Sequence, residues 1–406
     1  MPGDSDSNQE RVPYSLREEW KDVEPIFVQD GPDSICPISY LEEFKDTMSY
    51  LRAVMKNREI SERAFELVGD SIRIHPANYS AWLYRMELFW ALEKDVIEEL
   101  DWISDIASEN PKNYQLWHQR QQIIEALFKL GKIEEFGPTD YSAILEESIK
   151  VSQAANTKLP EAASKRLGEE SLDYAKLLSV ENFNNKLIKS EIHFLNEQID
   201  FDSKNFHAWS YRQFVVKTFN LFEYEYLYTK LKIEQDIRNN SAWNQLYFVL
   251  KNYFLLNEKS TPELNGAINP NIQSNCDVST LLIQHIEFAT SKIYLAPNNE
   301  SSWVFIQGLL RLHGPELLYT DLHSKIAQIL SLNDKKSEYL SQSRFYWEYL
   351  AKYYLHKRDS LTSDISNPRF LDYNNKAKDS YEKLANSLDP IRKNYWNYLL
   401  NKTVLL

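Results

Sequence analysis

The sequence predicts an all-α protein, a right-handed superhelical solenoid of helical hairpins of the tetratricopeptide type. A corner motif of Asn, often an aromatic residue, two variable residues and Trp recurs five times. Two of the intervals between successive Trp residues are 34 and 35 residues, the length of one helix–turn–helix repeat. The chain of 406 residues has only 9 glycines, whereas sheet-based folds usually need more. The five corners are PANYSAWLYR (76–85), PKNYQLWHQR (111–120), SKNFHAWSYR (203–212), IRNNSAWNQL (237–246) and PNNESSWVFI (297–306).

Each corner follows a segment with helical periodicity. In VIEELDWISDIASEN (96–110) and SEIHFLNEQIDFD (190–202), apolar residues recur at spacings of three and four, which places them in one stripe on a helix. Asn suits the corner because it tolerates left-handed backbone angles and can cap a helix start. We expect the corner Trp residues to pack between neighbouring hairpins, and we expect a structural role for the Arg that follows three of them. These are Arg85, Arg120 and Arg212.

The corner spacing predicts the organisation of the chain. We expect a disordered tail at 1–17, an N-terminal segment with the first helix at 18–60, hairpin repeats at 61–314, and degenerate helical repeats with a cap at 315–406. The remaining Trp intervals, 92 and 60 residues, indicate insertions near 131–187 and 257–280. The second insertion is rich in turn formers and reads as a loop. The first contains helix-like stretches and is interpreted either as an insertion or as a degenerate repeat.

Composition excludes several classes of protein. A net charge of −13 is opposite to the basic field of a general nucleic-acid binder. Two cysteines, Cys36 and Cys276, lie far apart without metal-ligand spacing and fit a reducing, cytoplasmic location. The N-terminus lacks the apolar region of a signal peptide, and no stretch approaches the roughly 18 apolar residues of a membrane span. No Walker, dinucleotide or nucleophile-elbow glycine motif occurs.

The corner motif resembles the repeat of the protein prenyltransferase α-subunits. EEWKDVEPIFVQDGPDSICPISY (18–40), RNNSAWNQ (238–245), PNNESSW (297–303) and IRKNYWNYL (391–399) are similar to the branch shared by protein farnesyltransferase and protein geranylgeranyltransferase type I. The resemblance implies a crescent that wraps a barrel-shaped β-subunit in a heterodimer. It also implies transfer of a prenyl group from its diphosphate to the cysteine of a C-terminal Cys-a-a-X sequence. Zn²⁺ would be held by the β-subunit and Mg²⁺ would accompany the diphosphate, so no metal ligand is expected here.

The resemblance also implies site residues at two corners. Lys112 and Tyr114 match catalytic positions beside the diphosphate, where a positive charge stabilises the leaving group. Gln115 matches the glutamine that binds the terminal carboxylate of the peptide. Asn205 and His207 match positions near the diphosphate, but Phe206 stands where the family usually has Tyr, so a hydroxyl contact is lost.

Three functions compete at this point. The first is the α-subunit of a Cys-a-a-X prenyltransferase, active only with its β-subunit. The second is a tetratricopeptide-like scaffold without catalysis, in which Lys112 would be a solvated turn lysine and His207 a helix-start histidine that bonds backbone or a partner. The third is the α-subunit of a Rab-type geranylgeranyltransferase. Lys112, Tyr114 and Gln115 in one turn favour an enzyme, and the Asp-Gly-Pro sequence of the N-terminal segment favours the first function.

Overall fold

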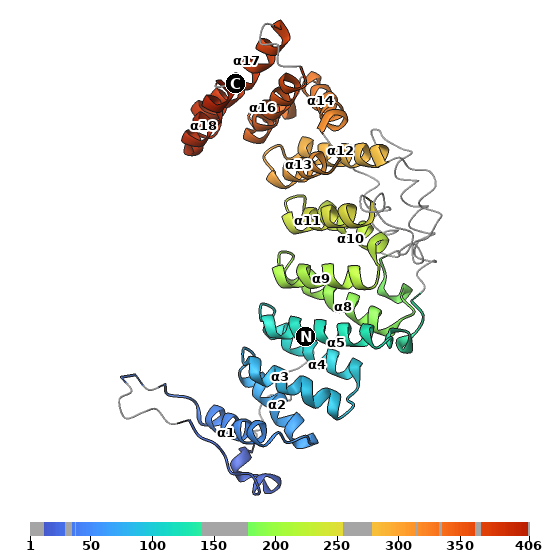
Figure 1. Cartoon of the computed structure of the whole chain (residues 1–406), viewed down its shortest axis with the longest axis vertical. Helices are drawn as coiled ribbons and strands as arrows, with labels where there is room; N and C mark the ends of the chain where they lie inside the picture. Colours follow the sequence, from blue (N-terminus) through green and yellow to red (C-terminus); the bar gives the residue numbers. More distant parts are fainter. Residues whose placement is uncertain are drawn as a thin grey trace. The chain divides into compact units, whose positions relative to one another are not determined.

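The computed structural model describes residues 12–28, 35–36, 38–139, 178–254, 278–313, 315–332, 335–361 and 367–404. This part of the chain contains sixteen α-helices and no β-strand, which confirms the all-α prediction (Figure 1). Residues 140–177 and 255–277, which make up most of the two expected insertions, lie outside the described residues. Residues 1–11 of the expected tail also lie outside them. The described residues belong to two compact units, one within 1–143 and 179–219 and the other within 144–178 and 220–406.

The first unit is a stack of helical hairpins (Figure 1). Its helices are α1 (Glu42–Asn57), α2 (Glu62–Ile74), α3 (Tyr79–Ala91), α4 (Val96–Glu109), α5 (Tyr114–Lys129), α8 (Lys186–Phe201) and α9 (Phe206–Thr218). The second helices α3, α5 and α9 pack on one another in that order, and the first helix α8 packs on α4. Hairpin α8–α9 therefore follows hairpin α4–α5 directly, and the long stretch of sequence between them does not interrupt the stack.

The second unit continues the hairpin pattern and ends in a packed helical group. Its helices are α10 (Phe222–Gln235), α11 (Asn240–Val249), α12 (Val278–Leu295), α13 (Glu300–His313), α14 (Pro315–Ser331), α15 (Lys335–Ser341), α16 (Arg344–Asp359), α17 (Pro368–Lys383) and α18 (Lys393–Val404). At the end, α16, α17 and α18 enclose a small core that includes Tyr381, Leu384 and Trp396.

The corner Asn residues cap the second helices. Asn78, Asn113, Asn205 and Asn239 have φ between −83° and −62°, and each side-chain oxygen accepts a hydrogen bond from a backbone N–H in the first helical turn. The capping role expected from the sequence is thus confirmed. The left-handed conformation that Asn tolerates is not used at these corners.

A backbone carbonyl at each corner accepts a hydrogen bond from the corner Trp, and at several corners it also joins two successive hairpins. We call it the corner carbonyl; it belongs to the residue two positions before the corner Asn. The indole Nε1 of the corner Trp donates to it, and at Pro76, Pro111 and Ile237 the Asn Nδ2 of the next hairpin donates to it as well. The Trp bonds are Trp82 to Pro76 (2.7 Å), Trp117 to Pro111 (3.0 Å), Trp209 to Ser203 (2.9 Å), Trp243 to Ile237 (2.9 Å) and Trp303 to Pro297 (3.0 Å). The Asn bonds are Asn113 to Pro76 (2.6 Å), Asn205 to Pro111 (3.0 Å) and Asn299 to Ile237 (2.5 Å).

These bonds explain why the motif fixes both residue types at one spacing. A carbonyl oxygen has two lone pairs, and Trp and Asn each supply one donor. All five corner Trp side chains are buried, as expected, so each contributes apolar area and one polar contact.

The Arg series is structural, as predicted. Arg85 pairs with Glu99 (Nη2 to Oε2, 2.7 Å), and both side chains are buried. Arg120 pairs with Glu191 (Nη2 to Oε1, 2.6 Å) in the same way. Each pair joins the second helix of one hairpin to the first helix of the next. In the second unit, Gln245 donates to the buried Glu225 (2.7 Å), next to Leu246, where the sequence lacks the Arg.

The structure adds a sixth corner that the sequence analysis missed. Trp347 Nε1 donates to the backbone carbonyl of Ser341 (2.7 Å), six residues earlier, as at the other five corners. Ser343 stands in the place of Asn, and its hydroxyl donates to the corner carbonyl of Pro297 (2.7 Å). The hydroxyl makes no cap hydrogen bond to α16, so Ser reproduces only one of the two functions of Asn.

Residues 12–17 correct the expected boundary of the tail. Tyr14 is buried, its hydroxyl donates to Asp70 (2.7 Å), and its backbone N–H donates to Asp46 (2.6 Å). Burial, followed by Asp70, raises the pKa of Tyr14 above its usual value. The side chain of Tyr14 packs edge-to-face on Trp20, with 5.1 Å between ring centroids. No sequence pattern predicted the packing of Tyr14 on Trp20, because short polar runs flank the two aromatic residues.

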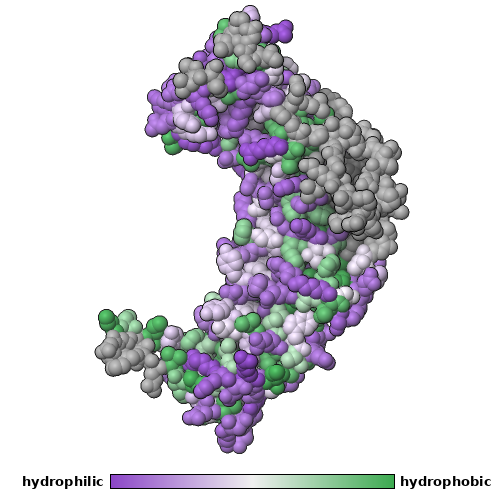
Figure 2. Space-filling model, viewed as in Figure 1, coloured by the Kyte–Doolittle hydropathy of each residue, from purple (hydrophilic) through white to green (hydrophobic). Residues whose placement is uncertain are grey.

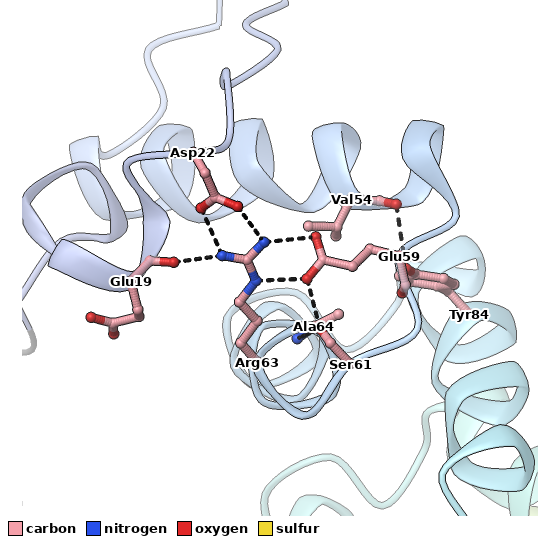
Figure 3. Close-up of polar contacts among 8 residues, drawn as sticks. All are labelled: Glu19, Asp22, Val54, Glu59, Ser61, Arg63, Ala64 and Tyr84. Atoms are coloured by element: carbon pink, nitrogen blue, oxygen red, sulfur yellow. Dashed lines mark hydrogen bonds and ion pairs between the residues drawn. The ribbon is translucent and has the colours of Figure 1, made fainter.

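A charged cluster holds residues 19–22 against α2 (Figure 3). Arg63 forms a two-point ion pair with Asp22 (2.8 and 2.9 Å) and an ion pair with Glu59 (2.6 Å), and it also donates to the backbone carbonyl of Glu19. The guanidinium lowers the pKa of both carboxyl groups. These contacts hold residues 19–22 against the start of α2.

Candidate functional site

The second corner exposes two of the predicted site residues. Asn113 caps α5 by accepting from the backbone N–H of Gln115 (2.8 Å), which makes Tyr114 the first residue of that helix. Tyr114 is 67% exposed, and the side chain of Lys112 is 75% exposed. Neither residue contributes to the hairpin core, so both side chains are available to a ligand or a partner.

The third corner repeats this geometry with different side chains. Asn205 caps α9 through the backbone N–H of His207 (2.9 Å), and Phe206 takes the exposed first position of the helix. The amide of Asn205 donates to the corner carbonyl of Pro111 (3.0 Å), and the residue is only 2% exposed. The side chain of Asn205 is therefore engaged at both ends, and it acts on the site by fixing the position of His207.

The two corners meet at the surface of the first unit. The rings of Tyr114 and His207 pack edge-to-face, with 4.3 Å between centroids and 86° between planes. The Nζ atom of Lys112 lies 3.7 Å from Oδ2 of Asp202, which ends α8 just before the third corner. The structure thus brings together Tyr114 and His207, which are 93 positions apart in the sequence, and Lys112 and Asp202, which are 90 apart.

The electrostatics favour an anion. Burial lowers the pKa of His207 below its usual value, and the positive charge of Lys112 lowers it further. His207 is consequently neutral near pH 7 and can donate one N–H. Lys112 supplies a full positive charge, Tyr114 supplies a hydroxyl donor, and the N-termini of α5 and α9 add partial positive charge. Such a set suits a phosphate or diphosphate.

Gln115 differs from this group in its exposure. It follows Tyr114 on α5 and is half-buried, and its side chain has no hydrogen-bond partner among the described residues. Its amide is therefore available for a contact with a ligand.

Sequence reasoning missed Asp202. The sequence feature that could have indicated it is an acidic residue three positions before the corner Asn. The first two corners have His75 and Asn110 at this position. Its Oδ1 atom accepts from the backbone N–H of Lys204 (3.1 Å), while Oδ2 faces Lys112. The carboxylate is thus a fixed part of the corner and the only acidic side chain recorded within 4 Å of Lys112 in the described chain.

Within the described ranges, no group of three or more His, Cys, Asp or Glu residues could hold a metal ion. No described helix combines the length and the apolar character needed to cross a bilayer.

Four of the corners lie in segments that match a known repeat family. Residues 61–92, 96–127, 188–219 and 222–253 match the Protein prenyltransferase alpha subunit repeat, and each match spans one hairpin. The Protein farnesyltransferase/geranylgeranyltransferase type-1 subunit alpha of Dictyostelium discoideum is 29% identical over 96% of this chain and 94% of its own length. The same subunit of Solanum lycopersicum is 42% identical over 25% of this chain and 30% of its own length.

A solved structure has the same fold. In Candida albicans protein geranylgeranyltransferase-I complexed with GGPP, one chain aligns with a TM-score of 0.62 and 24% identity, covering 97% of this chain and all of that one. The alignment extends across both units and includes the hairpins that the repeat family does not match.

Proposed function

Since the chain belongs to the protein prenyltransferase alpha subunit family, we propose that it contributes the diphosphate-binding corner of a heterodimeric protein prenyltransferase. It is an α-subunit of the farnesyltransferase/geranylgeranyltransferase type-1 kind. The proposed reaction transfers a farnesyl or geranylgeranyl group from its diphosphate to the cysteine of a C-terminal Cys-a-a-X sequence. The β-subunit with which the chain pairs would select the lipid.

The observation that carries this proposal is the meeting of Lys112, Tyr114 and His207 across two hairpins. As the bond between the lipid and its diphosphate breaks, negative charge grows on the leaving group. Lys112 and the hydroxyl of Tyr114 would stabilise that charge, and His207 would donate a neutral N–H. Because Asn113 and Asn205 cap α5 and α9, the backbone at Tyr114 and His207 needs little rearrangement when the ligand arrives.

The peptide would be bound beside this corner. Gln115 lies one residue beyond Tyr114, and its unpartnered amide suits the terminal carboxylate of a Cys-a-a-X sequence. The thiol would be activated by Zn²⁺ on the β-subunit, and Mg²⁺ would accompany the diphosphate. The two cysteines, far apart in the sequence, support a reducing, cytoplasmic location.

Reconstitution tests the proposal. The chain is co-expressed with a farnesyltransferase β-subunit or a geranylgeranyltransferase type-1 β-subunit, and each heterodimer is assayed for prenyl transfer to a Cys-a-a-X peptide with zinc and magnesium. Transfer by at least one heterodimer supports the proposal. Stable heterodimers without transfer would favour the scaffold interpretation. If the chain is also co-expressed with a type-2 β-subunit, transfer by that heterodimer alone, and only to Rab proteins, would favour the Rab-type α-subunit.

A further inference from the structure

We infer that Asp202 is the counter-ion of Lys112 before an anionic ligand binds and that this ligand displaces it. The inference rests on the proposed function, because it concerns the same lysine. Lys112 Nζ and Asp202 Oδ2 are 3.7 Å apart, beyond the roughly 2.7–2.9 Å of a charge-assisted hydrogen bond. The two groups are therefore paired in charge without a hydrogen bond that would have to break when the lysine turns to a ligand.

The two partners differ in mobility. Asp202 is fixed by its own backbone and side chain: its N–H donates to Gln198 (3.0 Å), its carbonyl accepts from Asn205 (3.0 Å), and its Oδ1 accepts from Lys204 (3.1 Å). Only one third of its side chain is exposed, compared with three quarters of that of Lys112. The lysine can consequently exchange its partner while the carboxylate remains in place.

The turn itself does not require an acidic residue at this position. Asn110 occupies the equivalent place at the second corner and His75 at the first. At the fourth corner, Asp236 makes the same turn contact, with its Oδ1 accepting from the backbone N–H of Arg238 (2.8 Å). An amide at position 202 could keep the turn bond, so the turn does not depend on the negative charge of Asp202. That charge instead opposes an anion held by Lys112.

Asp202 is thus expected to lower the affinity of the corner for diphosphate. An exposed ion pair contributes about 0.2–1 kcal/mol, so removing the competing carboxylate corresponds to roughly 1.5- to 5-fold tighter anion binding. In a working enzyme this weakening would favour release of the diphosphate product.

Pyrophosphate binding to the reconstituted heterodimer provides the test. Inorganic pyrophosphate is titrated calorimetrically into the wild-type enzyme and into the variants Asp202→Asn, Lys112→Ala and the double variant. Asp202→Asn keeps a side-chain oxygen for the turn and should bind pyrophosphate 1.5- to 5-fold more tightly. Lys112→Ala should bind it more weakly, and adding Asp202→Asn to that background should bring no gain. Asp236→Asn removes a carboxylate from the equivalent turn position and should leave the affinity unchanged.

The outcomes separate the inference from the function on which it rests. If Asp202→Asn leaves the affinity unchanged or weakens it while Lys112→Ala still weakens binding, the counter-ion role is overturned and the diphosphate role of Lys112 stands. A gain that persists without Lys112, or that Asp236→Asn reproduces, also overturns the pairing, because it reflects net charge. If Lys112→Ala has no effect on pyrophosphate binding, the proposed role of Lys112 is overturned together with the inference.

Discussion

Arg120 on α5 and Glu191 on α8 form an ion pair in which neither side chain has any exposed surface. The two residues are 71 positions apart in the sequence, on either side of the stretch at 140–177. Burial lowers the pKa of Arg120, but Glu191 and Tyr211 together raise it by more. The pKa therefore lies above its usual value, and the guanidinium stays charged. The pair therefore specifies that α8 follows α5 in the stack, and it requires both charges to be present.

Removing one member of this pair should strongly destabilise the protein. Arg120→Met leaves the carboxylate of Glu191 buried without its cation and should cost about 3–5 kcal/mol of unfolding free energy. Lys376→Met breaks an exposed ion pair with Asp372 and should cost less than about 1 kcal/mol. Chemical denaturation monitored by circular dichroism measures both values. Equal losses in the two variants would contradict the role assigned to the buried pair.

Loss of the Lys112 charge should slow prenyl transfer without dissociating the heterodimer. A charge-assisted hydrogen bond contributes about 1.5–3 kcal/mol, so Lys112→Ala should lower kcat/KM by roughly 10- to 150-fold. Arg238→Ala changes the residue at the same position of the fourth corner and provides the control, with transfer near the wild-type rate. Steady-state kinetics with a Cys-a-a-X peptide measure the effect, and unchanged kcat/KM for Lys112→Ala would remove this residue from the mechanism.

Restoring a hydroxyl at position 206 should improve transfer. Phe206 is 69% exposed at the first turn of α9, next to His207, so a hydroxyl added to its ring can reach a ligand without crowding the core. Phe206→Tyr should raise kcat/KM by up to about tenfold, the equivalent of one hydrogen bond. Tyr79→Phe makes the opposite change at the first corner, where Tyr79 is also exposed, and should have no effect. A neutral result for Phe206→Tyr would place this position outside the diphosphate site.

Acid should destabilise the second unit through His323. Burial lowers the pKa of His323 below its ordinary 6.5, and the positive charge of Lys357 lowers it further. The unfolded chain therefore takes up a proton more readily than the folded chain, so stability is retained above about pH 6.5 and lost as the pH falls below it. The ring stacks on Tyr353 at 4.2 Å between centroids, and phenylalanine can keep that stack without titrating.

The comparison of Tm at about pH 7.5 and pH 5.5 isolates this histidine. His323→Phe should show a smaller fall in Tm than the wild-type protein. His193 is exposed and faces Glu197, so His193→Phe should leave the wild-type fall unchanged. An identical acid-induced fall in the wild-type protein and His323→Phe would show that other groups cause it.

The regular parts of the fold were accessible to sequence reasoning because one contact pattern repeats. The spacing of Asn and Trp predicted five corners, and the capping by Asn and the burial of Trp are confirmed. The sixth corner was not predicted, because Ser343 stands where the motif requires Asn. Its hydroxyl nevertheless donates to a corner carbonyl as Asn does. The burial of Tyr14 was not predicted, because it depends on contacts with Asp46 and Asp70, which lie on two later helices.

The site was only partly predictable. The resemblance placed Lys112, Tyr114 and His207 at two corners, but the contact between Tyr114 and His207 depends on α8 following α5, which the 92-residue interval concealed. Asn205 resembled a ligand contact by its position, whereas the structure buries it as a helix cap. Asp202 belongs to the same surface because the end of α8 faces the preceding corner, a relationship that no local pattern encodes.

The corner carbonyls have a consequence for how the chain can change in length. Each accepts donors from its own hairpin and, at Pro76, Pro111, Ile237 and Pro297, from the next hairpin, so an added residue at a corner would misalign two hairpins at once. The corner carbonyls lie at one end of the hairpins, whereas both long extra stretches, 140–177 and 255–277, fall in the sequence between a second helix and the following first helix. A fluorescent reporter or an affinity tag spliced into those stretches should leave the assembly of the hairpins intact, whereas the same graft at a corner should abolish it.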